Sequence, residues 1–215
     1  MNYKAVLFDL DGTLLDTLDD LADSMNAALA RLGAPQHPTP AYRYFVGDGV
    51  IELCRRVLPA DRRDEATIKA AAAAMGDEYK QRWTAKTQPY PGIPELLDAL
   101  TARRVAMAVL SNKNNDFTQL CVKKMLARWR FDVVQGLDGT IHKKPDPSGA
   151  LAVARRLDIA PADFLYLGDT NTDMKTALAA GMFPVGALWG FRTAEELTAH
   201  GAKTLIAQPM DLLTL

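Results

Sequence analysis

A short apolar run near the amino end, Ala5–Phe8, limits what this chain can fold into more than any other feature. It is closed at once by the acidic and small residues 9–13. A continuous apolar run of this length is typical of a strand that is buried on both faces, as in a parallel sheet. The partners of such a strand must come from beyond residue 88, because residues 16–88 contain no convincing strand pattern. The first residues are therefore expected to pair with strands from the far end of the chain.

After residue 88 the pattern alternates between helices and short apolar strands. Strands that alternate with helices imply right-handed crossovers and a doubly wound, mostly parallel sheet, which is an α/β fold. A proline follows Asp146, and Asp146 is expected to cap the helix that begins there. The expected helices cover residues 94–103, 116–128, 147–157 and 172–180, and the expected strands cover 105–110, 133–134, 164–167, 185–188 and 204–206.

Residues 16–88 are predicted to be all helix and loop. Apolar residues recur at three- and four-residue steps, and Gly76 is expected to interrupt the last of these helices. The first strand can join the sheet only if this block is an insertion. We therefore predict a core made of residues 1–15 and 89–215, with residues 16–88 as an inserted helical cap above the strand ends. The expected helices of the insertion cover residues 17–32, 50–58 and 64–83.

Composition excludes several classes of function. The formal net charge of −1 offers no basic field for nucleic acid or for an anionic membrane. The two cysteines, Cys54 and Cys121, are too far apart in sequence to indicate a disulfide framework or a zinc site, so a reducing compartment is expected. No signal peptide or membrane-spanning segment is recognisable, and a cytoplasmic location is expected. The sequence does not indicate an oligomeric state.

Polar residues gather where the predicted strands end. Asp9 and Asp11 follow the first strand, Ser111 follows the second, and Asp169 follows the strand at 164–167, with Asp173 one helical turn further on. In open α/β sheets, ligands bind beyond the carboxyl ends of the strands. Carboxylates that converge there repel one another unless a cation neutralises them, and an all-oxygen set of ligands suits Mg²⁺. A lysine and a hydroxyl on the same edge are suited to holding a phosphoryl group.

These residues resemble the four motifs of the haloacid dehalogenase superfamily, in their order along the chain. The run Asp9-Leu10-Asp11-Gly12-Thr13-Leu14 resembles the first motif. Ser111, Lys144-Pro145 and the run from Gly168 to Asp173 resemble the second, third and fourth. The helical block is placed like the inserted cap of that superfamily. A single motif of this kind is modest evidence, whereas four in order at strand ends are specific.

The resemblance implies a phosphatase that uses Mg²⁺ and forms an aspartyl-phosphate. Asp9 is then the nucleophile, and Asp11 is the general acid and later the general base. The metal ligands are the Asp9 carboxylate, the Asp11 backbone carbonyl and Asp169, with Asp173 acting through water or through a neighbouring ligand. The expected phosphate contacts are Ser111, Asn112 and Lys144.

Three further segments are similar to phosphoglycolate phosphatases. They are Phe45–Gly49 in the insertion, Asn112-Lys113 after Ser111, and Trp189–Arg192 near the end. On this basis the expected substrate is a small phosphate ester such as 2-phosphoglycolate, with Gly47, Asp48 and Gly49 in the specificity element. Two glycines can bring backbone N–H groups close to a small anion, although such a run is equally typical of a plain turn.

Other interpretations stay open at this point. The same core would serve a phosphatase or phosphomutase for a sugar phosphate, a nucleotide or pyrophosphate. A phospho-accepting signalling domain or a binding protein also clusters acids and a lysine, although the Asp9–Asp11 pair and the insertion argue against both. Ser111 and Asp173 have simpler explanations as capping residues near helix starts.

Overall fold

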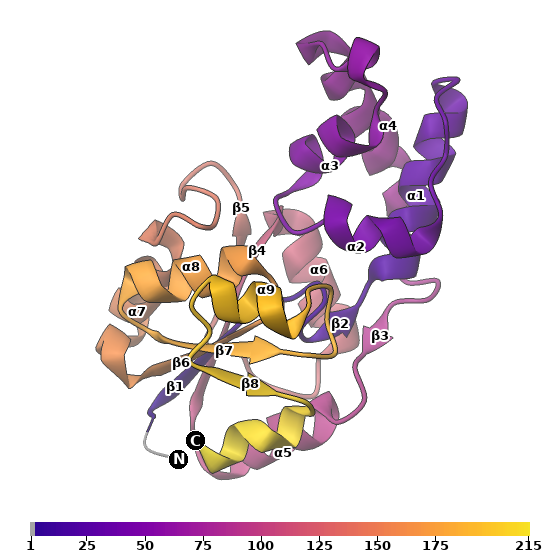
Figure 1. Ribbon diagram of the computed structural model, residues 1–215. Coiled ribbons are helices and arrows are strands. Elements are labelled where there is room, and N and C mark those ends of the chain that lie inside the picture. Colours follow the sequence, from indigo (N-terminus) through magenta and orange to yellow (C-terminus); the bar gives the residue numbers. More distant parts are fainter. Residues whose placement is uncertain (1–2) are drawn as a thin grey trace. The chain divides into compact units, whose positions relative to one another are not determined.

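The computed structural model describes residues 3–215, and the chain forms two compact units (Figure 1). One unit, called here the helical unit, is Asp16–Gln88. The other, called the core unit, contains the residues before and after it, up to Leu15 and from Pro89 to Leu215. The backbone passes between the units twice, and at these crossings two short strands pair, β2 (Leu15–Asp16) and β3 (Gln88–Pro89).

Within the described residues, the core unit is built on a six-stranded sheet with the order β5-β4-β1-β6-β7-β8. Every neighbouring pair of strands is parallel, and Leu7 of β1 stands beside Ala108 of β4 and Tyr166 of β6. The chain winds outward from the central β1 in both directions, which confirms the predicted α/β fold. The strands are β1 (Ala5–Phe8), β4 (Ala106–Asn114), β5 (Val133–Leu137), β6 (Phe164–Gly168), β7 (Phe183–Ala187) and β8 (Thr204–Ile206).

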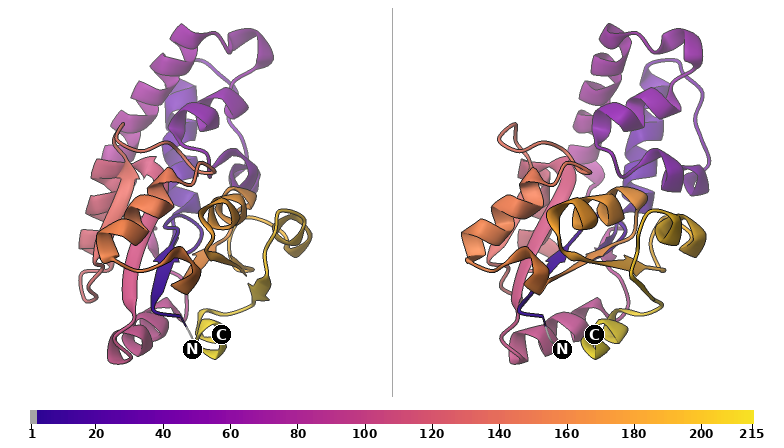
Figure 2. Two further views of the ribbon diagram at one scale, coloured as in Figure 1. Left: turned by 90° about the vertical axis from the view of Figure 1, so that its left-hand side faces the viewer. Right: turned by 60° about the vertical axis from the view of Figure 1, so that its left-hand side comes forward.

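Helices of the core unit lie on both sides of this sheet (Figure 2). Alternate strand residues point to opposite faces, so each face of β1 carries two apolar side chains. Leu7 and its neighbours on one face pack against α7 and α8. Phe8 points to the other face, where its ring meets that of Phe131 edge-on. The helices are α5 (Ile93–Ala102), α6 (Asn115–Met125), α7 (Ser148–Leu157), α8 (Asn171–Ala180) and α9 (Ala194–Ala199).

The helical unit consists of four α-helices with loops between them, as far as the described residues extend. Its buried residues include Met25 and Leu29 of α1, Leu53 of α3 and Met75 of α4. Gly76 does not interrupt α4, because the helix continues through it with open space around the missing side chain. The helices are α1 (Leu18–Arg31), α2 (Tyr42–Phe45), α3 (Val50–Val57) and α4 (Glu65–Arg82).

Buried Asp20 of α1 fixes the end of the helical unit. Its carboxylate accepts hydrogen bonds from the backbone N–H groups of Lys86 and Thr87 and from the Thr87 hydroxyl, at distances of 2.8 to 3.1 Å. The N–H groups of Lys86 and Thr87 lie between α4 and β3, where neither a helix nor a sheet offers them an acceptor, so Asp20 supplies it.

Several expected boundaries are wrong. Strand β4 continues to Asn114 instead of ending at Leu110, and its register with β5 shifts between these two residues. Helix α6 ends at Met125, three residues earlier than expected. Helix α7 has Pro147 as its N-cap residue, although the Asp146 carboxylate still accepts the N–H of Ser148 at 2.8 Å. The short helices α2 and α9 were not expected, because four to six residues show little periodicity.

No helix among residues 3–215 has the length and apolar character that crossing a bilayer requires.

Candidate active site

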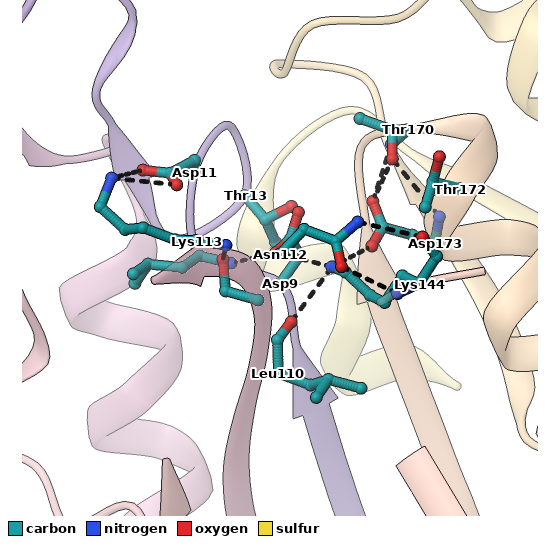
Figure 3. A network of polar contacts seen from close by, with 12 residues as sticks. Asp9, Asp11, Thr13, Leu110, Asn112, Lys113, Lys144, Thr170, Thr172 and Asp173 are labelled. Atoms are coloured by element: carbon teal, nitrogen blue, oxygen red, sulfur yellow. Dashed lines mark hydrogen bonds and ion pairs between the residues drawn. The ribbon is translucent and has the colours of Figure 1, made fainter. Parts of the chain in front are cut away.

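Asp9 lies directly beyond the last residue of β1 and is buried. Its Oδ1 atom accepts the N–H of Leu10 at 2.7 Å and lies 2.8 Å from Lys144 Nζ. The same ammonium group contacts Asp173 Oδ1 at 2.7 Å and donates to the carbonyl oxygen of Leu110 at 3.1 Å. One buried lysine therefore bridges two buried carboxylates, one at the end of β1 and the other in the first turn of α8 (Figure 3).

Burial controls the charge of this cluster. Loss of hydration raises the pKa of Asp9 well above its usual range, the Asp173 carboxylate raises it further, and Lys144 opposes both effects. Burial lowers the pKa of Lys144, but the carboxylates of Asp173 and Asp9 outweigh burial and raise it well above its usual range. Lys144 therefore stays a cation, while Asp9 needs more positive charge nearby than Lys144 alone provides.

Asp169, the first residue after β6, is held by both of its carboxylate oxygens. The hydroxyl of Thr13 donates to Oδ1 at 2.7 Å, and the backbone N–H of Phe191 donates to Oδ2 at 2.8 Å. Burial raises the pKa of Asp169 to about 7, Asp173 adds to the rise, and the two hydrogen bonds and Arg192 oppose it. A carboxylate oxygen has two acceptor positions, so each oxygen can still take a further ligand while its orientation is fixed.

Two glycines allow the backbone to come this close to Asp169. A Cβ atom on Gly12, whose φ is +88°, would collide with the Asp169 carboxylate. A Cβ atom on Gly190 would collide with the Asp169 side chain and with the carbonyl oxygen of Gly12. The indole N–H of Trp189 donates to the carbonyl oxygen of Thr13 at 3.0 Å and ties the two segments together. The segment Trp189–Arg192 thus has a role that its sequence alone did not indicate, since it holds Asp169 in place.

Asp9, Asp169 and Asp173 can each offer a carboxylate oxygen, and these atoms lie within 4.8 Å of one another. Lys144 contacts two of these three buried carboxylates, and the neighbouring negative charge of Asp173 contributes to the raised pKa of both Asp9 and Asp169. An all-oxygen set of donors with excess negative charge fits a hard divalent cation such as Mg²⁺. Among the described residues, this group contains two of the three predicted ligands. The third, Asp11, was predicted to contribute its backbone carbonyl and not its side chain.

The Asp11 carboxylate is paired with Lys113 instead. Lys113 Nζ lies 2.9 Å from one carboxylate oxygen of Asp11 and 3.1 Å from the other. The pair is shielded from solvent, because the two side chains are 8% and 17% exposed. Figure 3 shows this pair beside the cluster of Asp9, Lys144 and Asp173. The Lys113–Asp11 pair was not predicted, because no pattern in the sequence indicated a partner for the Lys113 side chain.

The predicted phosphate contacts Ser111 and Asn112 lie in β4 and are buried. Ser111 Oγ accepts the backbone N–H of Lys113 at 3.2 Å. The side-chain amide of Asn112 donates to the carbonyl oxygen of Lys144 at 3.1 Å and accepts the N–H of Lys144 at 2.8 Å. Asn112 therefore holds the backbone of the lysine that contacts Asp9. Phosphate binding by Ser111, Asn112 and Lys144 stays a prediction.

Asp173 belongs both to a helix cap and to the charged cluster. Its Oδ2 atom accepts the Thr170 N–H at 3.1 Å and the Thr170 hydroxyl at 2.6 Å. The Asp173 N–H donates to Thr170 Oγ1 at 3.3 Å, which completes a capping box at the start of α8. Its Oδ1 atom contacts Lys144, and the Tyr166 hydroxyl lies 3.4 Å away. The two explanations considered for Asp173, a cap and a partner of the site, are therefore compatible.

Gly47, Asp48 and Gly49 lie in the helical unit, in the loop between α2 and α3. Both glycines have positive φ, +111° and +82°, which other residues rarely adopt. The carboxylate of Asp48 forms an ion pair with Arg56, whose guanidinium also donates to the carbonyl oxygen of Phe45 at 3.1 Å. Arg56 therefore offsets the negative charge of Asp48, and the role of Gly47, Asp48 and Gly49 in substrate specificity stays a prediction.

The family model of the haloacid dehalogenase-like hydrolases matches residues 6–187 of this chain. The chain belongs to this family. Within it, the chain is 34% identical over 197 residues to a phosphoglycolate phosphatase of Nitrosospira multiformis, covering 90% of this chain and 87% of the relative. It is 30% identical over 212 residues to a phosphoglycolate phosphatase of Aquifex aeolicus, covering 99% of this chain and 96% of the relative.

Solved structures agree with this placement among the haloacid dehalogenase-like hydrolases. The crystal structure of a predicted phosphoglycolate phosphatase from Haemophilus somnus superposes with a TM-score of 0.91 at 26% identity, covering 100% of this chain and 98% of that one. That of a predicted phosphatase from Clostridium acetobutylicum has a TM-score of 0.86 at 26% identity and covers both chains fully. The expected resemblance is confirmed, and this chain is an enzyme of the phosphatase class.

Proposed function

We propose that this enzyme hydrolyses small phosphate monoesters with Mg²⁺, through an aspartyl-phosphate on Asp9, and that 2-phosphoglycolate is its substrate. The proposed chemistry rests on the position of the Asp9 carboxylate. This group is buried, it is held by Lys144, and the carboxylates of Asp169 and Asp173 lie close to it. The substrate is supported by the relatives, since those compared above over most of their length are phosphoglycolate phosphatases.

In the first half of the reaction, an oxygen of the Asp9 carboxylate attacks phosphorus. A new bond forms between this oxygen and phosphorus, and the bond from phosphorus to the ester oxygen breaks. Asp11, in its protonated form, gives its proton to the departing oxygen, so an alcohol leaves. A positioned general acid of this kind contributes about 10²–10⁴-fold in rate. Lys144 keeps the Asp9 carboxylate in place and balances part of the negative charge.

In the second half, the Asp11 carboxylate takes a proton from water while the water oxygen bonds to phosphorus. The bond from phosphorus to Asp9 breaks, which releases phosphate and restores the Asp9 carboxylate. Both halves need the phosphoryl oxygens held in place, and Ser111, Asn112 and Lys144 are the residues that we assign to this task.

The Asp9 and Asp169 carboxylates and the Asp11 backbone carbonyl would hold the metal ion, with Asp173 close by. When bound, Mg²⁺ supplies the positive charge that keeps Asp9 ionised and lowers its repulsion of the phosphate dianion. The hydrogen bonds from Thr13 and Phe191 fix Asp169 for this purpose. Outer contacts of this kind are commonly worth 10- to 100-fold in metal affinity or activity.

The test is phosphate release from a panel of esters, measured with Mg²⁺ and with excess EDTA. The panel contains 2-phosphoglycolate, a hexose phosphate, a nucleoside monophosphate, pyrophosphate and p-nitrophenyl phosphate. Turnover that requires Mg²⁺ and is fastest with 2-phosphoglycolate is the expected result. If another ester is fastest, the mechanism stands and the proposed substrate is wrong. If none turns over, the proposed phosphatase chemistry on small esters is wrong.

A further inference from the structure

We infer that Lys113 is a positioning residue for the reaction, which holds the Asp11 carboxylate in the orientation that water activation requires. This inference rests on the proposed function, because it assigns Lys113 to the step in which Asp11 acts as the base. Lys113 Nζ contacts both oxygens of Asp11, at 2.9 and 3.1 Å. Two contacts from one ammonium group direct both carboxylate oxygens toward the same charge and so hold the carboxylate in position.

The surroundings distinguish this pair from an ordinary surface ion pair. Exposed pairs usually contribute little, because water and salt screen them and both side chains stay mobile. Here the side chains of Lys113 and Asp11 are 8% and 17% exposed. Among the described residues, the ion pairs at Lys4, Lys69 and Arg128 each have one side chain about 70% exposed. The Lys113–Asp11 contact is therefore suited to holding one geometry.

The backbone of Lys113 is fixed on several sides. Its N–H donates to Ser111 Oγ at 3.2 Å, and its carbonyl oxygen lies 3.4 Å from Thr118 Oγ1. The register of β4 with β5 shifts between Leu110 and Asn114, and such irregularities often redirect a side chain beside an active site. Gly136 of β5 permits this close packing, because a Cβ atom there would collide with Thr118 and with the Lys113 carbonyl oxygen.

The two lysines of the site serve different carboxylates. Lys144 contacts Asp9 and Asp173, whereas Lys113 contacts Asp11, and Figure 3 draws both groups. In the second half-reaction Asp11 begins as a carboxylate, so Lys113 can hold both of its oxygens while one of them takes a proton from water. In the first half-reaction Asp11 is protonated and uncharged, so its hydrogen bonds from Lys113 are weaker than those of the carboxylate. Loss of Lys113 should therefore affect the second half most.

The experiment compares Lys113→Met and Lys113→Arg with the wild-type enzyme, using p-nitrophenyl phosphate and Mg²⁺. A control variant, Lys124→Met, removes one positive charge from the exposed end of α6. We measure kcat, kcat/KM and, after acid quenching, the fraction of enzyme that carries phosphate. For Lys113→Met we expect kcat to fall about 10- to 100-fold, the effect of a misplaced group. We expect kcat/KM to change by less than about threefold, and the phosphorylated enzyme to accumulate.

Other outcomes separate the alternatives. Lys113→Arg keeps the charge and should restore at least part of kcat, whereas Lys124→Met should match the wild type. In an Asp11→Asn background, Lys113→Met should add little further loss, because the two residues act through one contact. If kcat/KM falls as much as kcat and no phosphorylated enzyme accumulates, Lys113 contacts substrate and the inference is wrong. An unchanged kcat overturns it as well. If the wild-type enzyme hydrolyses no ester, the proposed function is wrong, and this result is distinct from the outcomes that contradict the role of Lys113.

Discussion

At the scale of single residues, the site depends on one buried lysine that contacts two carboxylates. Lys144 contacts both Asp9 and Asp173, and these contacts outweigh the effect of burial on its pKa. A lysine with a raised pKa stays charged beside Asp9, and its charge favours the ionised form of the Asp9 carboxylate in this apolar setting. The proposed nucleophile and its counter-charge are thus part of the same buried cluster.

The substitution Asp9→Asn tests the nucleophile directly. An amide cannot form the acyl-phosphate at a useful rate, so phosphate release should fall by at least about 10⁴-fold, as is typical when a nucleophile is removed. The fold should survive, because Asn has the same shape and Lys144 keeps its contact with Asp173. Phosphate release and circular dichroism, measured on the same preparation, check both points. Turnover near the wild-type rate would exclude Asp9 as the nucleophile.

Removing the lysine should destabilise the protein as well as inactivate it. Lys144→Met leaves two buried carboxylates without their cation, a change that typically costs about 3–5 kcal/mol of unfolding free energy. Urea unfolding at pH 7 without Mg²⁺ measures the loss. The loss should shrink at pH 5, where Asp9, whose pKa burial raises well above its usual range, can take up a proton instead. The neighbouring Lys143 is exposed, so Lys143→Met serves as the control and should stay within about 0.5 kcal/mol of the wild type.

At the scale of elements, the parallel sheet and the order of its strands along the chain were predictable, whereas the end of β4 and the contacts between side chains were not. The apolar run at Ala5–Phe8 and the alternation after residue 88 indicate the parallel sheet, and parallel strands end at one edge. That argument brings Asp9, Lys144 and Asp169 together. It cannot say that Lys113 pairs with Asp11, because that pairing depends on an irregularity inside β4 that leaves no mark in a hydrophobic pattern.

The start of α8 links secondary structure to the site. Thr170 caps the helix and also donates to Asp173 at 2.6 Å, so Thr170→Ala removes a cap and releases one side of that carboxylate. We expect a loss of about 1 kcal/mol in unfolding free energy and about tenfold weaker activation by Mg²⁺. Asp64 caps α4 in the helical unit, and Asp64→Ala should lower stability without changing the Mg²⁺ requirement. If Thr170→Ala and Asp64→Ala changed activation by Mg²⁺ equally, Thr170 would have no specific effect on the metal site.

At the scale of the whole molecule, the chain interrupts its sheet immediately after the first strand. Residues 16–88 fold as a unit with their own buried residues, and Asp20 closes that unit by accepting N–H groups from Lys86 and Thr87. The insertion leaves the core unit complete, because β1 still finds β4 and β6 as neighbours. The prediction that residues 16–88 act as a cap over substrate remains a proposal of ours.

The charge of the buried cluster should make the stability of the metal-free protein depend on pH. Burial raises the pKa of Asp169 from 3.8 to about 7, so between these values the folded state binds a proton that the unfolded state has lost. Stability from this group is therefore highest at low pH and should fall as pH rises from about 4 to about 7. Asp9, whose pKa is raised as well, contributes in the same direction.

Mg²⁺ should reverse this loss, because it competes with the proton for the same carboxylates. Below pH 7 its apparent affinity should weaken by about tenfold per pH unit for each proton displaced. Thermal unfolding from pH 5 to pH 8, with and without Mg²⁺, measures both effects, and the stabilisation by Mg²⁺ should be largest at pH 8. In Asp169→Asn the contribution of Asp169 disappears, so the metal-free protein should lose less stability over this range and gain less from Mg²⁺. Stabilisation by Mg²⁺ that is equal at pH 5 and pH 8 would place the ion somewhere other than these carboxylates.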